Sequence, residues 1–302
     1  MYMSKILIIT CSYDKTIDYI IEKNKYRANF FRFNVDLFAD YGITISNSYW
    51  EISYRNNTIN SNATLSIYYR KPTFPDTSDF APEYRRIINS DILAIIDGLA
   101  NSFSDVVLTK PYLLRQAENK IFQLIYAKSH SILMPKSFIG NNDHWKCIND
   151  QRIIKPISVG KIETSSGIAI IQTNLMHEND SYDSPELTPV YIQEYIKKSF
   201  EVRITVVDDD FFAVKIVSDN MIDWRAGNNN QYEIIDIPIE IKKCIKMMMK
   251  DFQLRFGAID YIVDIDGKWY FLEINPNGQW QWLECILGLS ISDSIMNMLL
   301  GG

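Results

Sequence analysis

The segment from Ala258 to Pro276 constrains the fold of this chain more than any other, because it combines a hairpin signal with ligand-type side chains. Asp266-Gly267 lies between two runs rich in apolar and aromatic residues, a pattern typical of an antiparallel hairpin with a two-residue turn. Side chains alternate between the two faces of a strand, so the turn fixes which residues pair. The predicted pairs are Val263 with Tyr270, Tyr261 with Leu272, and Asp260 with Glu273.

The predicted hairpin brings two carboxylates together on one face of a sheet. Asp260 lies opposite Glu273, and Asn275 follows Glu273 on the same face. Opposed like charges destabilise a sheet, and a bound cation removes that conflict. Two carboxylates and an amide oxygen are hard ligands, which suit magnesium shared with phosphate groups better than zinc. The segment therefore predicts a site for a metal ion and a nucleotide.

The composition excludes several classes of protein. The 302 residues are 47% hydrophobic, enough to build one large domain or two to three small ones. The net charge of −6, without any basic block, argues against a nucleic-acid partner. Four cysteines without CxxC spacing predict a reduced, cytoplasmic protein that lacks structural zinc. The apolar run Ile6–Ile9 is too short for a signal sequence or a membrane span, and predicts a buried first strand.

The order of the predicted elements divides the chain into three units. Residues 1–110 alternate strands with helices and predict an α/β domain. Residues 111–190 begin with an amphipathic helix over Arg115–His130 and continue with short strands and a polar loop. Residues 191–302 contain a strand pair, a helix and the predicted metal hairpin. The predicted fold class is therefore α/β in the first unit and α+β in the other two.

Two segments of the middle of the chain have the chemistry to contact a nucleotide. Lys155 ends a predicted strand before a loop with glycine and hydroxyl residues, where a lysine can contact phosphates; the alternative is an ordinary surface lysine. Gln193-Glu194-Tyr195-Ile196 places a polar pair among apolar residues. Its free backbone groups could bind adenine, with Tyr195 and Ile196 packed on the ring, or the segment is an ordinary strand.

Charged side chains also alternate along the strand that follows. Glu201 and Arg203 share one face, where Glu201 could accept hydrogen bonds from ribose and Arg203 could hold phosphate or carboxylate oxygens. The alternative is a structural ion pair. Lys215 lies opposite Arg203 only if the intervening loop has three residues, whereas a two-residue turn places it on the other face.

One further arginine lies in a polar loop. Arg225 follows Asp223-Trp224 and precedes a glycine and three asparagines. An arginine on such a loop, close to a metal and phosphate site, can stabilise charge that develops on a transferring phosphoryl or acyl group. The alternative is a solvated loop charge.

Taken in order, these segments resemble the ATP-grasp superfamily of carboxylate ligases over about the last two-thirds of the chain. The resemblance implies an ATP-grasp fold, with an N-terminal pre-ATP-grasp domain and two lobes that hold ATP between them. The candidate ATP-binding residues are Lys120, Lys155, Gln193, Glu194, Tyr195, Ile196, Glu201 and Lys215. The implied catalytic residues are Arg203 and Arg225, and the implied ligands of two magnesium ions are Asp260, Glu273 and Asn275.

A narrower resemblance is carried by three motifs. Phe271–Trp280, with its Glu-Ile-Asn-Pro-Asn-Gly-Gln core, looks like the signature of the graspetide synthetases, ATP-grasp enzymes that mature ribosomal peptides of microviridin and related types. Asp223-Trp224-Arg225 and Tyr69-Arg70-Lys71-Pro72 look like the same branch. The chain departs from that branch at Lys71, where many relatives have a second arginine, and in a loop after Lys155 that is poor in glycine.

The narrower resemblance implies both a reaction and a partner. ATP would phosphorylate an Asp or Glu side chain of a ribosomal precursor peptide, and the acyl phosphate would react with a Ser or Thr hydroxyl or a Lys amine. The product would be an ester or amide macrocycle. The precursor would also bind through a leader segment outside the active site, and the resemblance implies that the protein can form a homodimer.

Two other functions stay open at the level of sequence. The first is an ATP-grasp carboxylate–amine ligase that adds an amino acid to a protein or a small molecule. A short neighbouring reading frame with repeated Thr and Glu or Asp residues would favour peptide maturation instead. The second is a catalytically silent ATP-grasp protein that binds a peptide, against which the intact set Asp260, Glu273 and Asn275 argues.

Overall fold

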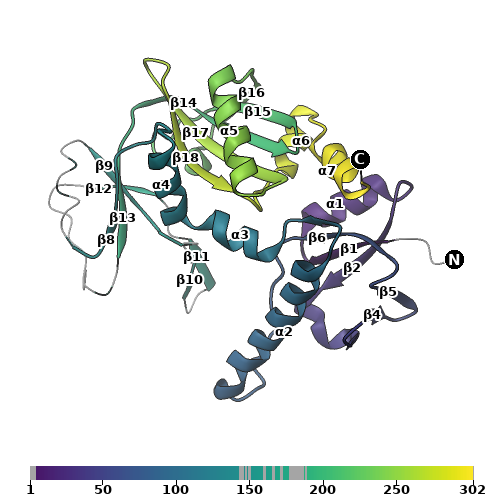
Figure 1. Cartoon of the computed structure of the whole chain (residues 1–302). Coiled ribbons are helices and arrows are strands. Elements are labelled where there is room, and N and C mark those ends of the chain that lie inside the picture. Colours follow the sequence, from purple (N-terminus) through teal and green to yellow (C-terminus); the bar gives the residue numbers. More distant parts are fainter. Residues whose placement is uncertain are drawn as a thin grey trace.

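The computed structural model describes residues 5–142, 146, 148, 151–158, 161–164, 167–170, 173–176, 187 and 189–301. Among these residues, no helix is both long enough and apolar enough to cross a membrane. Figure 1 shows an N-terminal α/β part, a small sheet at the opposite end, and a larger sheet covered by a helix above them.

The N-terminal part is built on a parallel sheet of four strands in the order β2-β1-β6-β7. The four central residues of the first strand, Ile6–Ile9, are apolar and fully buried, as expected for a central parallel strand. A three-stranded antiparallel sheet, β3-β4-β5, packs beside it. The bounds are β1 Lys5–Thr10, α1 Lys15–Asn24, β2 Asn29–Asn34, the 3-10 helix Val35–Asp40, β3 Gly42–Ile45, β4 Trp50–Tyr54, β5 Asn57–Asn60, β6 Thr64–Tyr69, α2 Pro82–Ser102 and β7 Val106–Leu108.

The middle of the chain holds two short helices and an antiparallel sheet of order β12-β9-β13-β8. The single helix predicted over Arg115–His130 is wrong, because the chain breaks at Asn119, whose side chain caps the second helix by accepting from the amides of Ile121 and Phe122. The bounds are α3 Pro111–Glu118, α4 Lys120–Ser129, β8 Ser137–Gly140, β9 Arg152–Lys155, β10 Lys161–Thr164, β11 Gly167–Ile170, β12 Asn174–Met176 and β13 Val190–Glu194.

The C-terminal part is a five-stranded antiparallel sheet in the order β16-β15-β14-β17-β18. Apolar residues of α4 and α5 pack on one face, and α1, α6 and α7 contribute the core on the other, around Trp280. The bounds are β14 Lys198–Val207, β15 Asp210–Val217, the 3-10 helix Trp224–Ala226, β16 Gln231–Ile234, α5 Ile239–Asp251, β17 Phe256–Asp264, β18 Trp269–Asn275, α6 Gln281–Leu287 and α7 Ile291–Leu299.

The β17–β18 hairpin forms as predicted, but its register differs near the turn. Asp260 pairs with Glu273 as expected, whereas Tyr261 pairs with Phe271 and Val263 with Trp269. Each observed partner therefore precedes the predicted one, Leu272 or Tyr270, by one residue. The turn is one residue longer than predicted, with Gly267 in the left-handed conformation at φ 79°, and a bulge at Leu272 restores the predicted pairing from Asp260 onward.

A buried carboxylate joins the first helix to the last two. Glu284 on α6 accepts hydrogen bonds from Tyr19 and Lys23 of α1 at 2.7 and 2.8 Å, and from the amide of Ser292 at the start of α7 at 2.6 Å. Burial raises the pKa of Glu284, but the hydrogen bonds from Lys23 and Ser292 outweigh it and hold the pKa below the usual value. The charged form of this side chain therefore ties the C-terminal part to the N-terminal part.

Replacing Glu284 with glutamine should lower the free energy of unfolding by about 1–3 kcal/mol, because Lys23 loses its buried partner. The folded-state pKa lies below the unfolded one, so the stabilisation is present at neutral pH and is lost as the pH falls through the folded pKa. Urea titrations of both proteins should show the difference shrinking in acid. If the difference in the free energy of unfolding between the two proteins did not change with pH, Glu284 would not be charged in the folded protein as described above.

Candidate active site

A row of three charged side chains crosses the middle of the five-stranded sheet. Arg203 on β14 pairs in register with Asp260 on β17, which pairs with Glu273 on β18. Nη1 of Arg203 donates to both carboxylate oxygens of Asp260, at 2.9 and 2.8 Å, and both side chains are almost fully buried. Antiparallel pairing puts directly opposed residues on one face, so the three charges lie side by side.

Basic side chains lie against both of the opposed carboxylates. Asp260 is neutralised by Arg203 and by Arg225, whose Nη2 lies 3.3 Å from Asp260 Oδ2. Glu273 faces Lys120 at 3.8 Å. Arg203, Arg225 and Lys120 thus balance the charge of the paired carboxylates, so the opposition alone does not indicate a metal.

Arg225 reaches this row from the loop before β16. Asp223 caps the short 3-10 helix Trp224–Ala226 by accepting from the amide of Arg225 at 3.0 Å, and its carboxylate also contacts the guanidinium at 3.3 Å. The guanidinium lies over the Trp224 ring, 5.0 Å from its centre. The Arg225 side chain is 49% exposed, against 7% for Arg203, so Arg225 is the partner of Asp260 that can move.

Two lysines approach the same row from the middle of the chain. Nζ of Lys155, at the end of β9, donates to Oε1 of Gln193 at 2.9 Å and lies 4.4 Å from the centre of the Tyr191 ring. Nζ of Lys120, the first residue of α4, donates to the carbonyl of Pro156 at 3.0 Å. The fold therefore places both lysines, which were predicted to bind ATP, near Glu273. Part of the loop that follows Lys155, residues 159–160 and 165–166, lies outside the described residues.

Desolvation and neighbouring charges change the pKa of both lysines. Desolvation lowers the pKa of Lys155 to about 8, although Glu273 and Asp260 oppose this. Desolvation also lowers the pKa of Lys120, which Glu273 opposes and Lys155 reinforces. These shifts show two cations crowded into a partly desolvated space, an arrangement that a polyanion such as triphosphate would relieve.

The predicted hinge is only partly free to bind adenine. The amides of Glu194 and Tyr195 donate to the carbonyls of Lys136 and Gln151 at 2.8 and 2.7 Å, so these two backbone donors are not free to bind adenine. Sheet pairing takes these groups because β13 lies between β8 and β9. Ile196 follows at the end of the segment, where its half-buried side chain remains a candidate ring contact.

Glu201 and Lys215 lie on opposite faces of the sheet, and each forms its own ion pair. Glu201 forms its ion pair with Lys198 at 2.5 Å rather than with Arg203, and burial raises its pKa although Lys198 opposes this. The turn between β14 and β15 has two residues, so Lys215 pairs with Val202 on the opposite face from Arg203. There it contacts Glu233 at 3.2 Å, and it does not join the row of charges.

The donor set of the predicted metal site fits a hard cation. Asp260, Glu273 and Asn275 offer carboxylate and amide oxygens along one edge of the hairpin, as magnesium prefers. Oδ1 of Asn275 accepts from the amide of Asn277 at 3.0 Å, which fixes its direction. In the described part of the chain, no group of three or more His, Cys, Asp or Glu side chains could hold a metal ion.

Sequence reasoning gave no role to several residues around Arg203. A β-carbon on Gly278 would lie 2.4 Å from Cβ of Ala258 and 2.8 Å from Nη2 of Arg203, so only glycine lets the guanidinium lie over this loop. Arg70, which is fully buried, contacts Asp14 at 3.1 Å and Oε1 of Gln279 at 2.7 Å. The sequence marked the motifs Tyr69–Pro72 and Asn277–Trp280 only as parts of a family resemblance. The fold shows that the two motifs contact each other.

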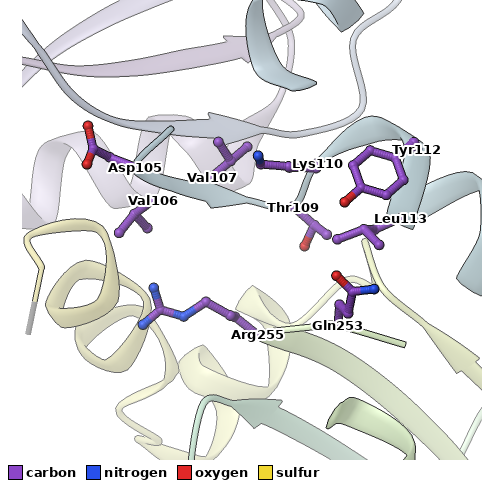
Figure 2. Close-up of a pocket in the computed structure, with 9 residues that line it drawn as sticks. All are labelled: Asp105, Val106, Val107, Thr109, Lys110, Tyr112, Leu113, Gln253 and Arg255. Atoms are coloured by element: carbon purple, nitrogen blue, oxygen red, sulfur yellow. The ribbon is translucent and has the colours of Figure 1, made fainter. Parts of the chain in front are cut away.

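A cavity of about 380 Å3 lies apart from these charges, between β7 and the loop before β17. Figure 2 shows Gln253 and Arg255 facing Val106 and Thr109 across it. Arg255 is already held by two hydrogen bonds of 2.6 Å from its guanidinium to Asp208. Asp208 therefore neutralises the Arg255 charge, and the other cation that lines this cavity is Lys110.

The pKa of Lys155 predicts how nucleotide affinity depends on pH. Because this pKa is lowered to about 8, the free protein loses the Lys155 charge as the pH rises through that value. The dissociation constant for ATP should therefore rise by roughly tenfold between about pH 7 and about pH 9.5. Calorimetric titration with wild type and Lys155→Arg checks this, since arginine keeps its charge throughout. An identical pH dependence in the variant would contradict the role of Lys155.

Known proteins show which family has this geometry. Residues 117–299 match the RimK-like ATP-grasp domain, and residues 5–113 match the MvdD pre-ATP-grasp domain. A comparison with curated proteins finds no match. The chain is similar to several solved structures, of which three are described below.

The first is a Chryseobacterium gregarium RiPP-associated ATP-grasp ligase in complex with ADP and a leader and core peptide, at 25% identity and TM-score 0.88, covering 98% of this chain and 96% of that one. The second is the macrocyclase MdnC of Microcystis aeruginosa bound to its precursor peptide, at 25% identity and TM-score 0.89, covering 99% and 100%. The third, the ATP-grasp ligase PsnB with minimal precursor, Mg and ADP, is 18% identical with TM-score 0.76, covers 98% and 97%, and bears on the fold alone. The chain belongs to the RimK-like ATP-grasp family of ATP-dependent ligases and carries an MvdD-type pre-ATP-grasp domain.

Proposed function

We propose that this protein is an ATP-dependent macrocyclase of a ribosomally made precursor peptide. It activates Asp or Glu side chains of the peptide as acyl phosphates and joins them to Ser or Thr hydroxyls or Lys amines. Two solved structures that align with nearly the whole chain are described as a RiPP-associated ligase and a macrocyclase, each bound to precursor peptide. Those descriptions support the proposal for a chain of the same length and fold.

The observation that carries the proposal is the meeting of two sets of charges. Arg203, Asp260 and Glu273 form a row on the C-terminal sheet, and Lys120 and Lys155 approach it from the middle of the chain. The phosphates of ATP bound between them would lie between Arg203 on one side and the two lysines on the other. Asp260, Glu273 and Asn275 would hold magnesium, which would neutralise charge on the phosphates.

The two arginines then have separate tasks. Arg203 donates to both oxygens of the buried Asp260, so it holds a positive charge at a fixed position in the site. Arg225 is half-exposed on its loop and is free to turn toward the carboxylate of the substrate or its acyl phosphate. A carboxylate oxygen attacks the γ-phosphorus and ADP leaves; a hydroxyl or amine then attacks the acyl carbon, losing its proton, and phosphate leaves.

Several finer features belong to the same proposal. Two magnesium ions are bound during turnover, the leader segment binds outside the active site, and the protein acts in the cytoplasm, with a homodimer as its assembly. The division into units 1–110, 111–190 and 191–302 is proposed as the division into a pre-ATP-grasp domain and two lobes. The four parallel strands β2-β1-β6-β7 end before residue 110 and support the first boundary.

Mass spectrometry of the short peptide encoded beside this gene, after co-expression with the protein, tests the function. Loss of one or more waters that mild base reverses indicates ester macrocycles, and loss that survives base indicates amides. A gain of an amino-acid residue would instead support the carboxylate–amine ligase. An unchanged mass with bound peptide would contradict the proposal and favour a silent peptide-binding protein.

Substituting Glu273 with glutamine should reduce ATP turnover roughly hundredfold, because one anionic metal ligand is lost. The melting temperature should change little, since the contact with Lys120 at 3.8 Å is partly exposed. Glu240→Gln, which alters an exposed residue at the start of α5, is the matched control. Full turnover in Glu273→Gln would refute the metal assignment.

Substituting Arg225 with alanine should lower kcat at least tenfold while changing the affinity for ATP little, because its half-exposed guanidinium acts on developing charge. Steady-state kinetics together with calorimetric titration separate the two effects. Arg86→Ala, an exposed arginine of α2, serves as the control. An equal loss in both quantities would make Arg225 a ground-state contact.

A further inference from the structure

The loop between β18 and α6 carries a side chain whose orientation is set by the N-terminal part of the protein. Nη2 of Arg70, at the end of β6, donates to Oε1 of Gln279 at 2.7 Å. The hydroxyl of Thr16, in the first turn of α1, lies 3.3 Å from the same oxygen. Arg70 is fully buried and is itself held by Asp14 at 3.1 Å, so its position is fixed.

This contact determines which end of the Gln279 amide faces outward. A guanidinium has only donors, so the amide atom that it contacts must be the oxygen. The nitrogen Nε2, on the other branch of the planar amide, then points away from Arg70. Gln279 is an exposed residue, and within the described part of the chain its Nε2 donates no hydrogen bond.

The position of Gln279 places these free donors beside the row of charges. Its backbone carbonyl accepts from Nη2 of Arg203 at 3.3 Å, and the preceding Gly278 lies directly under that guanidinium. Asp260, on the other side of Arg203, is the candidate metal ligand. An exposed amide with two N–H donors next to an arginine fits an anionic oxygen and does not fit a cation.

We propose that Gln279 contacts the substrate, with its Nε2 donating to the carboxylate that is phosphorylated, and that Arg70 is the positioning residue that orients this amide. The inference rests on the proposed function for the class of substrate, an acidic peptide side chain. During the reaction one carboxylate oxygen attacks the γ-phosphorus and ADP leaves, while Nε2 holds the second oxygen. The N-terminal domain therefore contributes to recognition of the substrate through Arg70.

The variant Gln279→Glu tests the proposal sharply, because glutamate keeps the oxygen that Arg70 contacts and replaces the N–H donors with an acceptor. The assay traps the acyl phosphate of the short neighbouring peptide with hydroxylamine, whose nitrogen attacks the acyl carbon as phosphate leaves, giving a hydroxamate and releasing a proton. We expect kcat/KM for hydroxamate formation to fall about tenfold or more. The affinity for ADP and the melting temperature should not change.

The matched control is Gln253→Glu, the same change of charge on an exposed residue before β17. If Gln279 merely bridges Arg70 to the loop, glutamate preserves the bridge and hydroxamate formation stays at the wild-type level, which overturns the proposal. An equal loss of ADP affinity also overturns it, because it would place Gln279 in the nucleotide pocket.

Arg70 is tested by comparing two substitutions in the same assay. Arg70→Met removes the donor that orients the amide, and it should lower kcat/KM with ADP affinity retained. Arg70→Lys keeps a donor and the charge beside Asp14, and it should recover most of the loss. Equal loss in both variants would overturn the positioning role.

The two levels of the proposal fail differently. Hydroxamate without macrocycle in the wild-type protein would refute macrocyclisation and leave Gln279 as a contact of the activated carboxylate. Macrocycle formed at the wild-type rate by Gln279→Glu would refute the role of Gln279 and leave the proposed function intact.

Discussion

The buried ion pair between Arg203 and Asp260 is the interaction on which the rest of the site depends. Both side chains lie in the middle of the five-stranded sheet and are more than nine-tenths buried. Removing one partner of such a pair leaves an uncompensated buried charge and costs about 3–5 kcal/mol. The pair therefore depends on two features of the fold. The register of β14 and β17 places Arg203 opposite Asp260, and the glycine at residue 278, in the loop to α6, leaves room for the guanidinium.

The charges around this pair differ in how firmly they are held. Arg203 is fixed by two hydrogen bonds to Asp260, whereas Arg225 reaches Asp260 through one contact of 3.3 Å and Lys120 lies 3.8 Å from Glu273. The cation of each of these two looser pairs is partly exposed, so each pair contributes less to stability than the buried pair does. Lys120 can thus exchange its carboxylate for phosphate oxygens and Arg225 can turn toward the substrate, while Arg203 stays in place. The site is built as a rigid centre with exchangeable cations at its edge.

The sequence predicted the chemistry of the hairpin better than its geometry. The pairing of Asp260 with Glu273 is correct because a longer turn and a bulge at Leu272 cancel, and neither irregularity has a sequence signal as strong as Asp266-Gly267. The face of the sheet on which Lys215 lies depends on whether the β14–β15 turn has two or three residues, and the local sequence does not decide between them. The resemblance to peptide-maturing ATP-grasp ligases is confirmed by the family matches and by the solved structures. The contact between Arg70 and Gln279 joins residues that are 209 positions apart, and only tertiary structure shows it.

The most direct test of the central claim is a crystal structure with magnesium and a non-hydrolysable ATP analogue. The charges described above predict magnesium on Asp260, Glu273 and Asn275, with Arg203 still paired to Asp260, Arg225 turned away from it, and phosphates between Lys120 and Lys155. A nucleotide bound elsewhere, such as the cavity at Arg255, would contradict the claim. So would phosphates at this site with Asp260 still engaged by both arginines and no metal ion.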